Sequence, residues 1–330
     1  MTSTMASVPI TGGWRTRAAS TTDGSSTKQM NALQTLQRIP DLTVEGHVPM
    51  SAHTSFGIGG PADVLVIPHS VAGLAEALRA LSTLNEKPTV IGNGTNMLVL
   101  DGGIRGVVVK IANGMSAVHV RGDQVVAEAG VRVAELCRTC AYQGLGGLEW
   151  AAGIPGTLGG ALSMNAGANG GETGQFVEWI RYITADGGIE TRWAQEGDFG
   201  YRTSYFQGKD LVIAQAGLRL LRGEPGELRE KMCGVLETRC QKQPVAMRSA
   251  GCVFKRPEGD YAGRLLQEAG AKGMRVGDAL VSHKHANFIV NEGNATAQDV
   301  LTLIELVRAR VREKFDVDLI PEICVIGEPL

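Results

Sequence analysis

The sequence predicts an α+β protein with two lobes of mixed helix and strand, followed by a smaller C-terminal α+β unit. Its 330 residues, 43% of them hydrophobic, are enough to bury more than one core. Over 53–221, short β-strand patterns alternate with single helical patterns, as expected of mixed lobes. A change in composition at 222–226, RGEPG, then separates the last part of the chain. We therefore expect three units, over 36–98, 99–222 and 223–330.

Composition and charge exclude several classes of function. The net charge is −2, so no basic excess marks a nucleic-acid-binding protein. No run of about 18 apolar residues is present, so a membrane span is not expected. Six cysteines are too few for a disulfide scaffold, which favours a reduced, cytoplasmic setting. Cys137 and Cys140 lie three apart on one predicted helix and are interpreted as buried small residues rather than a redox or metal-binding pair.

The N-terminal segment differs from the rest of the chain. Residues 1–35 are rich in Ser, Thr, Gly and Ala and hold few large apolar side chains. We predict a disordered extension here. Two alternatives are a true start near Met30 and an organellar transit peptide, which shares the bias toward Arg and Ser.

The first lobe begins with a glycine turn that resembles a nucleotide-binding motif only in its spacing. Gly57, Gly59 and Ala62 match the pattern G-x-G-x-x-A. A dinucleotide-binding loop follows a buried strand and opens a helix. Here no apolar strand precedes the glycines, and Pro61 leads into a strand pattern. We therefore predict a turn that enters the first strand of the lobe.

A helix and a polar loop follow. Ser70 is the predicted cap of a helix over 71–85, and a short strand is predicted over 88–92. The strand runs into the loop 92–96, GNGTN. Such a loop can turn its N–H groups and a hydroxyl toward a phosphate, although a plain turn has the same composition.

The second lobe is predicted to be rich in strands. Short β patterns fill 97–130, and a helix is predicted over 132–143. The segments 176–184 and 189–193, joined by Asp-Gly-Gly, form a predicted hairpin. A further strand is expected over 211–221.

A glycine-rich stretch lies at the centre of this lobe. Residues 153–174 read GIPGTLGGALSMNAGANGGETG, with eight glycines and several apolar side chains. The stretch is too apolar for a linker and too rich in glycine for an ordinary helix or strand. Glycine at this density lets the main chain approach a ligand closely, so the stretch predicts a cofactor-binding loop.

The third unit alternates helices with short strands. A charged helix follows 222–226, and the segment 248–257 is a predicted turn into a short strand. A strand is predicted over 286–291, and a capping box opens a helix over 297–314. The segment 318–327 is a predicted final strand, interrupted by proline.

Several of these stretches together resemble one enzyme family. HTSFGIGGPADVLVIP, GNGTNMLV, AGIPGTLGGALSMNAGANGGE and YRTSYF occur in the same order in the UDP-N-acetylenolpyruvoylglucosamine reductases, and SAGCVFKRP, HANFIVN and IPEICVIG continue the likeness. The resemblance runs from about residue 40 to the C-terminus. No extra segment separates YRTSYF from the helix of the third unit. The chain therefore resembles the shorter class of the family, which lacks the additional substrate loop.

The resemblance implies a fold, a reaction and its cofactors. The first two lobes would form a two-lobed FAD-binding domain of the vanillyl-alcohol-oxidase (PCMH) type, and the third would bind a UDP-sugar. The reaction is the NADPH-dependent reduction of UDP-N-acetyl-3-O-(1-carboxyvinyl)-glucosamine to UDP-N-acetylmuramate, a peptidoglycan precursor. FAD is expected to be non-covalent and NADPH a co-substrate. No metal is expected, and the enzyme is expected to be a cytoplasmic monomer.

Three residues carry the chemistry by this resemblance. Arg202 matches the arginine that holds the substrate carboxylate, for which a guanidinium fork is suited. Glu322 matches a glutamate that stabilises the enolic intermediate. Cys252 stands at the position of the proton donor, where serine is more usual. A thiol is the stronger acid, with an ordinary pKa of about 8.5, and would also leave the site open to alkylation.

Further residues are assigned to ligands by the same resemblance. Those expected to contact FAD are Ser55, Phe56, Gly92, Asn93, Gly94, Thr95, Asn96, Gly153, Ile154, Gly156, Gly159, Gly160, Asn165, Ala166 and Gly167. Those expected to contact the UDP-sugar are Lys255, Arg256, Tyr261 and Asn287. A solvated charged rim is the alternative interpretation of the latter group. His283 and His285, two apart beside a predicted strand, could form a metal site, but the resemblance implies that no metal is needed.

Two other functions remain open at this point. One is another FAD oxidoreductase of the same fold with a different substrate, in which His53 could attach the flavin covalently. The small third unit argues against it, since such enzymes carry a larger substrate domain. The other is a nucleotide-binding module without turnover, against which the presence of all three catalytic groups argues.

Overall fold

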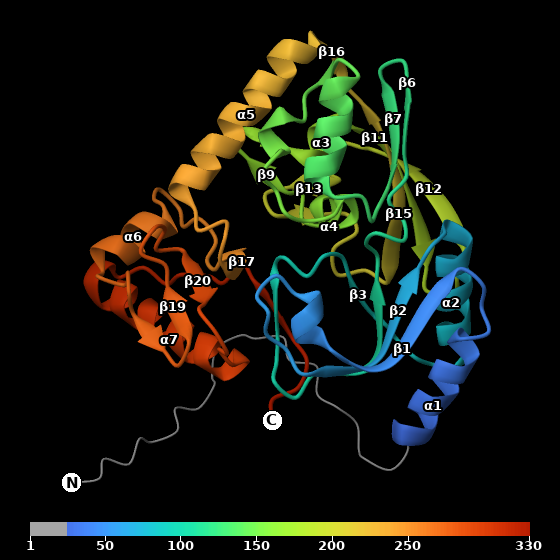
Figure 1. The fold of residues 1–330 in the computed structure, drawn as a ribbon, viewed down its shortest axis with the longest axis horizontal. Helices are drawn as coiled ribbons and strands as arrows, with labels where there is room; N and C mark the ends of the chain where they lie inside the picture. Colours follow the sequence, from blue (N-terminus) through green and yellow to red (C-terminus); the bar gives the residue numbers. More distant parts are fainter. Residues whose placement is uncertain (1–24) are drawn as a thin grey trace.

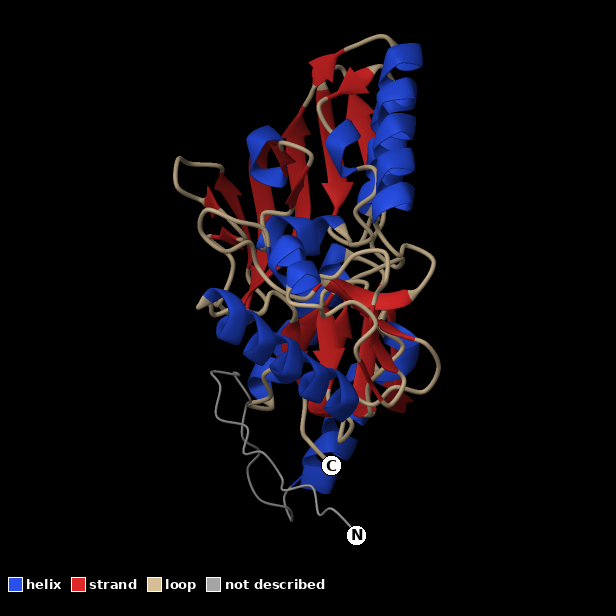
Figure 2. Cartoon of the chain, turned by 90° about the vertical axis from the view of Figure 1, so that its left-hand side faces the viewer, coloured by secondary structure: helices blue, strands red, loops and turns tan. Residues whose placement is uncertain are grey.

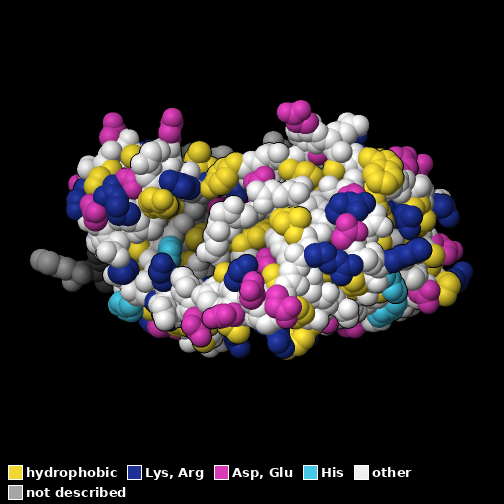
Figure 3. All heavy atoms as spheres, turned by 90° about the horizontal axis from the view of Figure 1, so that it is seen from above, with side chains coloured by type: hydrophobic (Ala, Val, Ile, Leu, Met, Phe, Trp, Pro, Cys, Tyr) yellow, Lys and Arg dark blue, Asp and Glu magenta, His cyan; other side chains and the backbone are white. Residues whose placement is uncertain are grey.

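The computed structural model describes residues 25–330 of the chain. Figure 1 shows three units, with the first lobe at the lower right, the second lobe above it and the third unit at the lower left. Figure 2 shows the arrangement turned by 90°, with the strands of the second lobe extending away from the other two units. No helix within 25–330 combines the length and apolar character that a bilayer crossing requires. On the face seen in Figure 3, charged side chains of both signs are interspersed.

The first lobe is built on a four-stranded sheet in the order β1-β2-β5-β3. Strand β1 pairs antiparallel with β2, whereas β2, β5 and β3 run parallel. The elements of this lobe are α1 (Ser25–Leu36), β1 (Leu42–Pro49), a 3₁₀ turn (Met50–His53), β2 (Pro61–Pro68), α2 (Val71–Thr83), β3 (Thr89–Ile91), β4 (Met97–Val99) and β5 (Ile104–Lys110). Ser70 caps α2 as predicted, because its hydroxyl accepts a hydrogen bond from the Gly73 N–H at 3.0 Å.

Two predictions about the start of the lobe have different outcomes. No helix follows Gly57 and Gly59, since β2 begins at Pro61, and the rejection of a dinucleotide-binding loop is confirmed. The predicted disordered extension over 1–35 reaches too far, because α1 begins at Ser25. Ala32 and Leu36 of this helix are buried in the core, and their four-residue spacing is the signal that the sequence reading missed. The rest of the predicted extension lies outside the described residues.

The boundary expected at 98/99 is also displaced. Strand β5 was assigned to the second lobe, yet it lies between β2 and β3 in the sheet of the first. Its run of valines, Val107 to Val109, is buried. A continuous apolar run is typical of a parallel strand covered on both faces, and this explains its position. The chain enters the second lobe only after β5.

The second lobe contains a five-stranded antiparallel sheet in the order β12-β11-β15-β7-β6. The predicted hairpin is confirmed as β11 paired with β12. The elements are β6 (Val118–Arg121), β7 (Gln124–Glu128), α3 (Val133–Tyr142), β8 (Leu145–Gly146), a 3₁₀ turn (Glu149–Ala151), α4 (Leu158–Ser163), β9 (Gly167–Ala168), β10 (Gly171–Glu172), a 3₁₀ turn (Thr173–Phe176), β11 (Val177–Thr184), β12 (Ile189–Trp193), β13 (Phe199–Gly200), β14 (Thr203–Ser204), β15 (Leu211–Arg219) and β16 (Leu221–Arg222). The glycine-rich stretch thus forms one short helix and two very short strands.

The third unit contains a four-stranded antiparallel sheet in the order β17-β20-β19-β18, flanked by two helices. Its elements are β17 (Arg248–Cys252), α6 (Ala262–Glu268), β18 (Arg275–Val276), β19 (Ala279–Val281), β20 (Phe288–Asn291) and α7 (Ala297–Phe315). The capping box predicted at the start of α7 is present, with Thr296 and Asp299 as its two partners.

Two segments assigned to the third unit pack elsewhere. Helix α5 (Pro225–Lys242) buries Leu228 and Met232 in the core that the two lobes share. The last strand, β21 (Cys324–Ile326), pairs in parallel with β4 near the first lobe. In Figure 1 the red C-terminal segment accordingly leaves the third unit and runs beside the first lobe. The boundary expected at 222/223 therefore marks a change in composition, but two segments that follow it in sequence pack against the lobes.

The third unit is also joined to the first lobe through its core. Phe56 and Ile58, from the glycine turn, and Leu98, from β4, are buried in the same hydrophobic cluster as the apolar face of α7. This cluster and the pairing of β21 hold the third unit against the lobes, and the candidate site lies at this junction.

Candidate active site

Two cavities meet where the three units come together. One cavity has a volume of about 540 Å³ and is bounded by the loop 92–96, the glycine-rich stretch and the start of β15. A second cavity, of about 520 Å³, lies in the third unit. Arg202, Cys252 and Glu322 line both cavities. The structure therefore brings the three predicted catalytic side chains to the junction between two separate spaces, which we call the cofactor cavity and the third-unit cavity.

Arg202 is placed by a tight hairpin. It lies in the turn between β13 and β14 with φ at +56°, a conformation that costs a non-glycine residue free energy. Its Nη1 donates to the carbonyl oxygen of Gly167 at 3.2 Å. Asn165 ties the hairpin to the glycine-rich stretch, since its Nδ2 donates to Gly200 O at 3.0 Å and its Oδ1 accepts from Gly174 N at 2.9 Å. The guanidinium is thereby fixed at the cavity wall.

Arg202 and Glu322 form an ion pair with one unused donor. Arg202 Nε and Glu322 Oε1 lie 2.9 Å apart. Their alignment does not make a hydrogen bond, so the buried Nε has no hydrogen-bond partner among the described residues. A buried donor without a partner is costly, and an anionic ligand entering the cavity would satisfy it.

Glu322 is held between the third unit and the first lobe. Its N–H donates to Val253 O at 2.7 Å, and the Asn96 side chain donates to its carbonyl at 3.4 Å. The next strand continues the connection, because Cys324 N donates to Asn96 O at 2.9 Å. Burial raises the pKa of the Glu322 carboxyl above its ordinary value, against opposing effects of Arg202 and Lys255.

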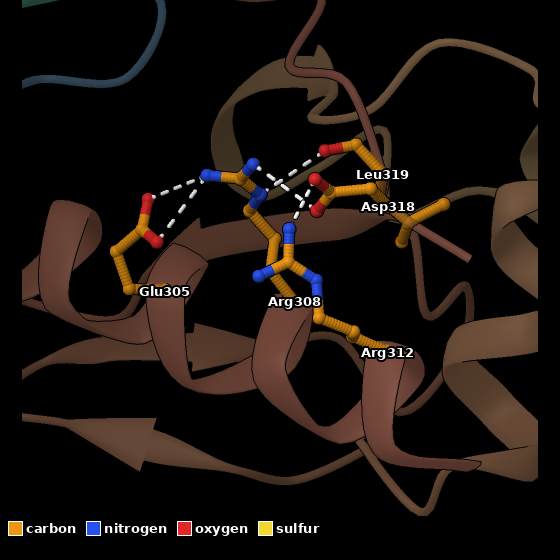
Figure 4. A network of polar contacts seen from close by, with 5 residues as sticks. All are labelled: Glu305, Arg308, Arg312, Asp318 and Leu319. Atoms are coloured by element: carbon orange, nitrogen blue, oxygen red, sulfur yellow. Dashed lines mark hydrogen bonds and ion pairs between the residues drawn. The ribbon is translucent and has the colours of Figure 1, made fainter. Parts of the chain in front are cut away.

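Upstream of Glu322, α7 anchors the segment through a polar network (Figure 4). Arg308 Nε donates to Leu319 O at 3.1 Å, and the same guanidinium contacts Glu305 and Asp318. Arg312 also pairs with Asp318. The path of the chain toward Glu322 is therefore set by one face of α7.

Cys252 is the last residue of β17 and is half-buried in the wall of both cavities. Burial, followed by the carboxylate of Glu322, raises the pKa of the Cys252 thiol to about 11, against smaller effects of Arg202 and Arg239. The thiol is consequently protonated at neutral pH. This suits a proton donor and makes Cys252 less open to alkylation than its residue type alone suggests.

Most residues predicted to contact FAD line the cofactor cavity. They are Gly92, Asn93, Gly94, Thr95, Asn96, Ile154, Gly156, Gly159, Gly160, Ala166 and Gly167. Two of the glycines are required by close approach. A Cβ at Gly94, where φ is +62°, would lie 2.4 Å from His53 O, and one at Gly92 would lie 2.4 Å from Thr157 Oγ1. At these two positions the main chain therefore lies at the cavity wall without an intervening side chain, which lets a flat, phosphate-bearing cofactor approach it closely.

Four of the predicted FAD contacts do not line this cavity. Ser55 instead donates to Ser249 O at 2.7 Å, and Phe56 is fully buried in the core of the junction. Asn165 is buried and bonded to backbone, as described above. Gly153 lies against the side chain of Arg239. These residues pack behind the cavity wall. The sequence motif alone does not distinguish such residues from those that line the cavity.

In the third-unit cavity, three of the four predicted substrate contacts are present. Arg256, Tyr261 and Asn287 line it, whereas Lys255 does not. The guanidinium of Arg256 lies over the Tyr261 ring at 4.1 Å. Asn287 is buried and bonds both backbone groups of Phe254, at 2.9 and 2.8 Å, so part of its role is structural.

Sequence reasoning missed other residues that line the two cavities. In the third-unit cavity they include Tyr201, Arg264, Gln267, Lys284 and His285, and in the cofactor cavity Gln207, Lys209, Arg239 and Gln243. Arg239 and Gln243 are four apart at the end of α5, a spacing that places two side chains on one face. This spacing could have identified the two residues in the sequence, but most of their neighbours are also charged or polar, so the two did not stand out.

Three residues considered for other roles lie apart from the site chemistry. Cys137 and Cys140 are buried, and burial raises the pKa of Cys140 to about 12. His53 contacts Lys110 at 3.1 Å and does not line the cofactor cavity. Within 25–330, no group of three or more His, Cys, Asp or Glu side chains is arranged to hold a metal ion.

Comparison with known proteins defines the class to which this fold and site belong. Residues 62–191 match the FAD binding domain family, and 243–326 match the C-terminal domain of UDP-N-acetylenolpyruvoylglucosamine reductase. The chain is thus a flavoenzyme with an FAD-binding domain and a C-terminal reductase domain, and the predicted fold class is confirmed.

The individual relatives agree. The chain is 46% identical to the UDP-N-acetylenolpyruvoylglucosamine reductase of Alkaliphilus oremlandii, over 85% of this chain and 92% of that protein. It is 44% identical to that of Caldanaerobacter subterraneus, over 89% and 98%. The crystal structure of the Thermus caldophilus enzyme superposes with a TM-score of 0.75 at 35% identity, covering 87% of this chain and 100% of that one. The chain belongs to the UDP-N-acetylenolpyruvoylglucosamine reductase family.

Proposed function

We propose that the protein reduces UDP-N-acetyl-3-O-(1-carboxyvinyl)-glucosamine to UDP-N-acetylmuramate, the peptidoglycan precursor, with NADPH as the reductant and FAD as the cofactor. The observation that carries this proposal is the position of Arg202, Cys252 and Glu322 at the junction of the two cavities. When bound in the cofactor cavity, FAD would supply the transfer of hydride from NADPH to the enolpyruvyl double bond. The remaining steps fall to the side chains of this chain.

Arg202 is assigned to the substrate carboxylate. A vinyl ether accepts hydride poorly unless its carboxylate is polarised, because negative charge develops on it during addition. The unused Nε donor of Arg202 is suited to this anion, and a charge-assisted hydrogen bond is stronger than a neutral one. Glu322, whose pKa is raised by burial, is assigned to the same developing enolate. In its protonated form it would donate a hydrogen bond there.

Cys252 is assigned to the final proton transfer. The α-carbon must be protonated after hydride has reached the β-carbon, and this needs an acid in its protonated form. With a pKa of about 11, the thiol keeps its proton at neutral pH. A carbanionic centre is a far stronger base than a thiolate, so the transfer remains downhill. Arg202 and Arg239, which lower this pKa, stabilise the thiolate that results.

The two lobes and the third unit are assigned separate ligands. We place FAD between the lobes and the UDP-sugar in the third unit, where Arg256, Tyr261 and Lys284 offer two cations and a ring to a nucleoside diphosphate. We further propose a monomer, because one chain supplies all three catalytic groups. We assign it to the cytoplasm because its six cysteines are too few for a disulfide scaffold. Size-exclusion chromatography with light scattering tests the monomer.

Two half-reactions test the function directly. The purified protein should show a flavin spectrum that NADPH bleaches under anaerobic conditions, and the enolpyruvyl sugar should then restore it with formation of UDP-N-acetylmuramate. Bleaching without recovery would instead favour an FAD oxidoreductase with another substrate. Colour that stays with acid-precipitated protein would contradict non-covalent FAD.

A further inference from the structure

The end of α5 presents two polar side chains to the cofactor cavity, Arg239 from its last turn and Gln243 from the position directly after the helix, and neither side chain has a partner among the described residues. The side chain of Arg239 makes no hydrogen bond, ion pair or ring contact with any described residue. Gln243 Oε1 is buried and likewise accepts no hydrogen bond from residues within 25–330. A buried acceptor and a half-buried guanidinium are both costly to leave unpaired, so the pair points to a ligand.

The position of the pair distinguishes between the two cavities. Arg239 and Gln243 line the cofactor cavity and do not line the third-unit cavity. The other charged side chains along the cofactor cavity have partners, since Arg202 pairs with Glu322 and Lys209 lies over the Tyr205 ring. Arg239 therefore offers a free positive charge to the cofactor rather than to the sugar.

The neighbours of Arg239 locate it along the cavity. Its Cδ lies against Gly153, at the start of the glycine-rich stretch, and its charge acts on the Cys252 thiol. This step rests on the proposed function, in which Cys252 protonates the carbon next to the one that receives hydride. Cys252 then marks the position of the isoalloxazine, and Arg239 lies at that ring system rather than at the pyrophosphate.

We propose that Arg239 and Gln243 recognise the imide edge of the isoalloxazine, and that Arg239 stabilises the negative charge which reduction places on its N1–C2=O end. The edge presents carbonyl oxygens on either side of an N–H. A guanidinium beside an amide oxygen is complementary to it, with Arg239 donating to a carbonyl and Gln243 accepting from the N–H. Burial lowers the pKa of Arg239 from its ordinary high value, yet the side chain stays charged.

Sulfite provides a probe that needs neither NADPH nor sugar. Its sulfur lone pair adds to flavin N5, and the electron pair displaced from the N5–C4a double bond becomes a negative charge at N1–C2=O. We expect R239Q to weaken sulfite binding to the FAD-loaded protein roughly tenfold or more, as expected for the loss of one charge-assisted hydrogen bond. R239K keeps the charge and should lie between R239Q and wild type.

The control is R229Q, on the same helix. Arg229 is exposed and bonds only the Pro225 carbonyl and the face of Tyr142, so its variant should bind sulfite as wild type does. Wild-type sulfite affinity in R239Q would overturn the assignment of Arg239. If R239Q did not retain FAD, the decision would rest on R239K, and a sulfite affinity equal to that of the wild type in R239K would overturn the assignment.

Gln243 is tested with FAD methylated at N3, which lacks the N–H. Wild-type apoprotein should bind it roughly tenfold or more weakly than FAD, and Q243L should lose most of this discrimination. Undiminished discrimination in Q243L would overturn the assignment of Gln243. None of these measurements involves the UDP-sugar. A protein that bound FAD but failed to reduce the sugar would refute the proposed function while the sulfite result still decided on Arg239.

Discussion

The cofactor cavity and the third-unit cavity are built from different materials. The first includes many glycine and alanine residues, contributed chiefly by the loop 92–96 and the glycine-rich stretch, where main chain reaches the cavity wall. The second is lined by charged and aromatic side chains, among them Arg256, Tyr261 and Lys284. A wall of main chain cannot be altered by truncating side chains, but it fails when a Cβ is added. A cavity lined by side chains is affected differently. Removing one side chain removes one contact with the ligand and lowers the affinity by the contribution of that contact, and added bulk matters only where the side chains are closely packed.

The residues at the junction of the two cavities should give the largest effect. We expect C252A to slow reoxidation of the flavin by the enolpyruvyl sugar by about 10²- to 10⁴-fold, since a positioned acid contributes that much. Reduction by NADPH should keep its wild-type rate, and C252S should recover much of the activity. Anaerobic stopped-flow absorbance separates the two steps. Reoxidation of C252A at the wild-type rate would remove Cys252 from the mechanism.

A change in the main-chain wall should come next. In G94A, the new Cβ would meet His53 O at 2.4 Å, and the backbone would keep φ at +62°. We expect FAD affinity to fall roughly tenfold or more, from the strain of the left-handed conformation and the clash together. G208A is the matched control, because Gly208 lines the same cavity with φ at +78° and no atom within 4 Å of its would-be Cβ. Fluorescence titration of apoprotein with FAD compares the two variants, and equal losses would show that strain alone is responsible.

A change in the side-chain wall should be more selective. We expect R256Q to raise the KM for the UDP-sugar by roughly tenfold, as for loss of one charged contact, and to leave FAD affinity unchanged. Steady-state kinetics with a saturating NADPH concentration measure this. R275Q, which removes a surface arginine paired with Asp278 and Glu292, is the control. A fall in FAD affinity in R256Q would contradict the separation of the two cavities.

The last test changes no residue and follows the pH dependence of Cys252 alkylation. Because its pKa is raised to about 11, the reactive thiolate is scarce at neutral pH and increases as the pH rises toward that value. We expect the rate to rise about tenfold for each pH unit below it. Peptide mapping after iodoacetamide treatment would follow Cys252 separately from the exposed Cys233 and Cys240. A rate that levels off near pH 8 would show that the pKa is not raised.

Local patterns predicted the elements of this fold well, and their assembly less well. Ser70, the capping box of α7 and the hairpin β11–β12 depend on neighbouring residues, and the sequence contains all that they require. The positions of β5 and β21 depend on pairing with strands far away in the chain, for which a short apolar run gives no partner. The misplaced boundary at 98/99 and the misassignment of β21 have this origin, whereas α1 was missed because the spacing of its buried residues was overlooked.

The same division applies to the site. Arg202, Cys252 and Glu322 were found because they lie in sequence motifs, and the structure brings them together. Arg239 lies in a charged helix and Gln243 directly follows it. The exposed and inward faces of this helix look alike in sequence, because nothing local shows which turn meets the cavity. Phe56 shows the reverse case, in which a residue within a motif is buried in a core. Motifs therefore identified the region of the site. Only the packing of α5 and of the glycine turn showed which residues line a cavity and which are buried behind it.

The return of the C-terminal segment to the first lobe has a consequence for biogenesis. Glu322 and β21 are synthesised after both lobes, yet the carboxylate completes the catalytic group and the strand pairs with β4, which lies far earlier in the chain. A nascent chain can fold both lobes before this segment appears. The reactive centre is then complete only after Glu322 has been synthesised, so a chain truncated before this residue would keep most of the lining of the cofactor cavity and lack the catalytic carboxylate.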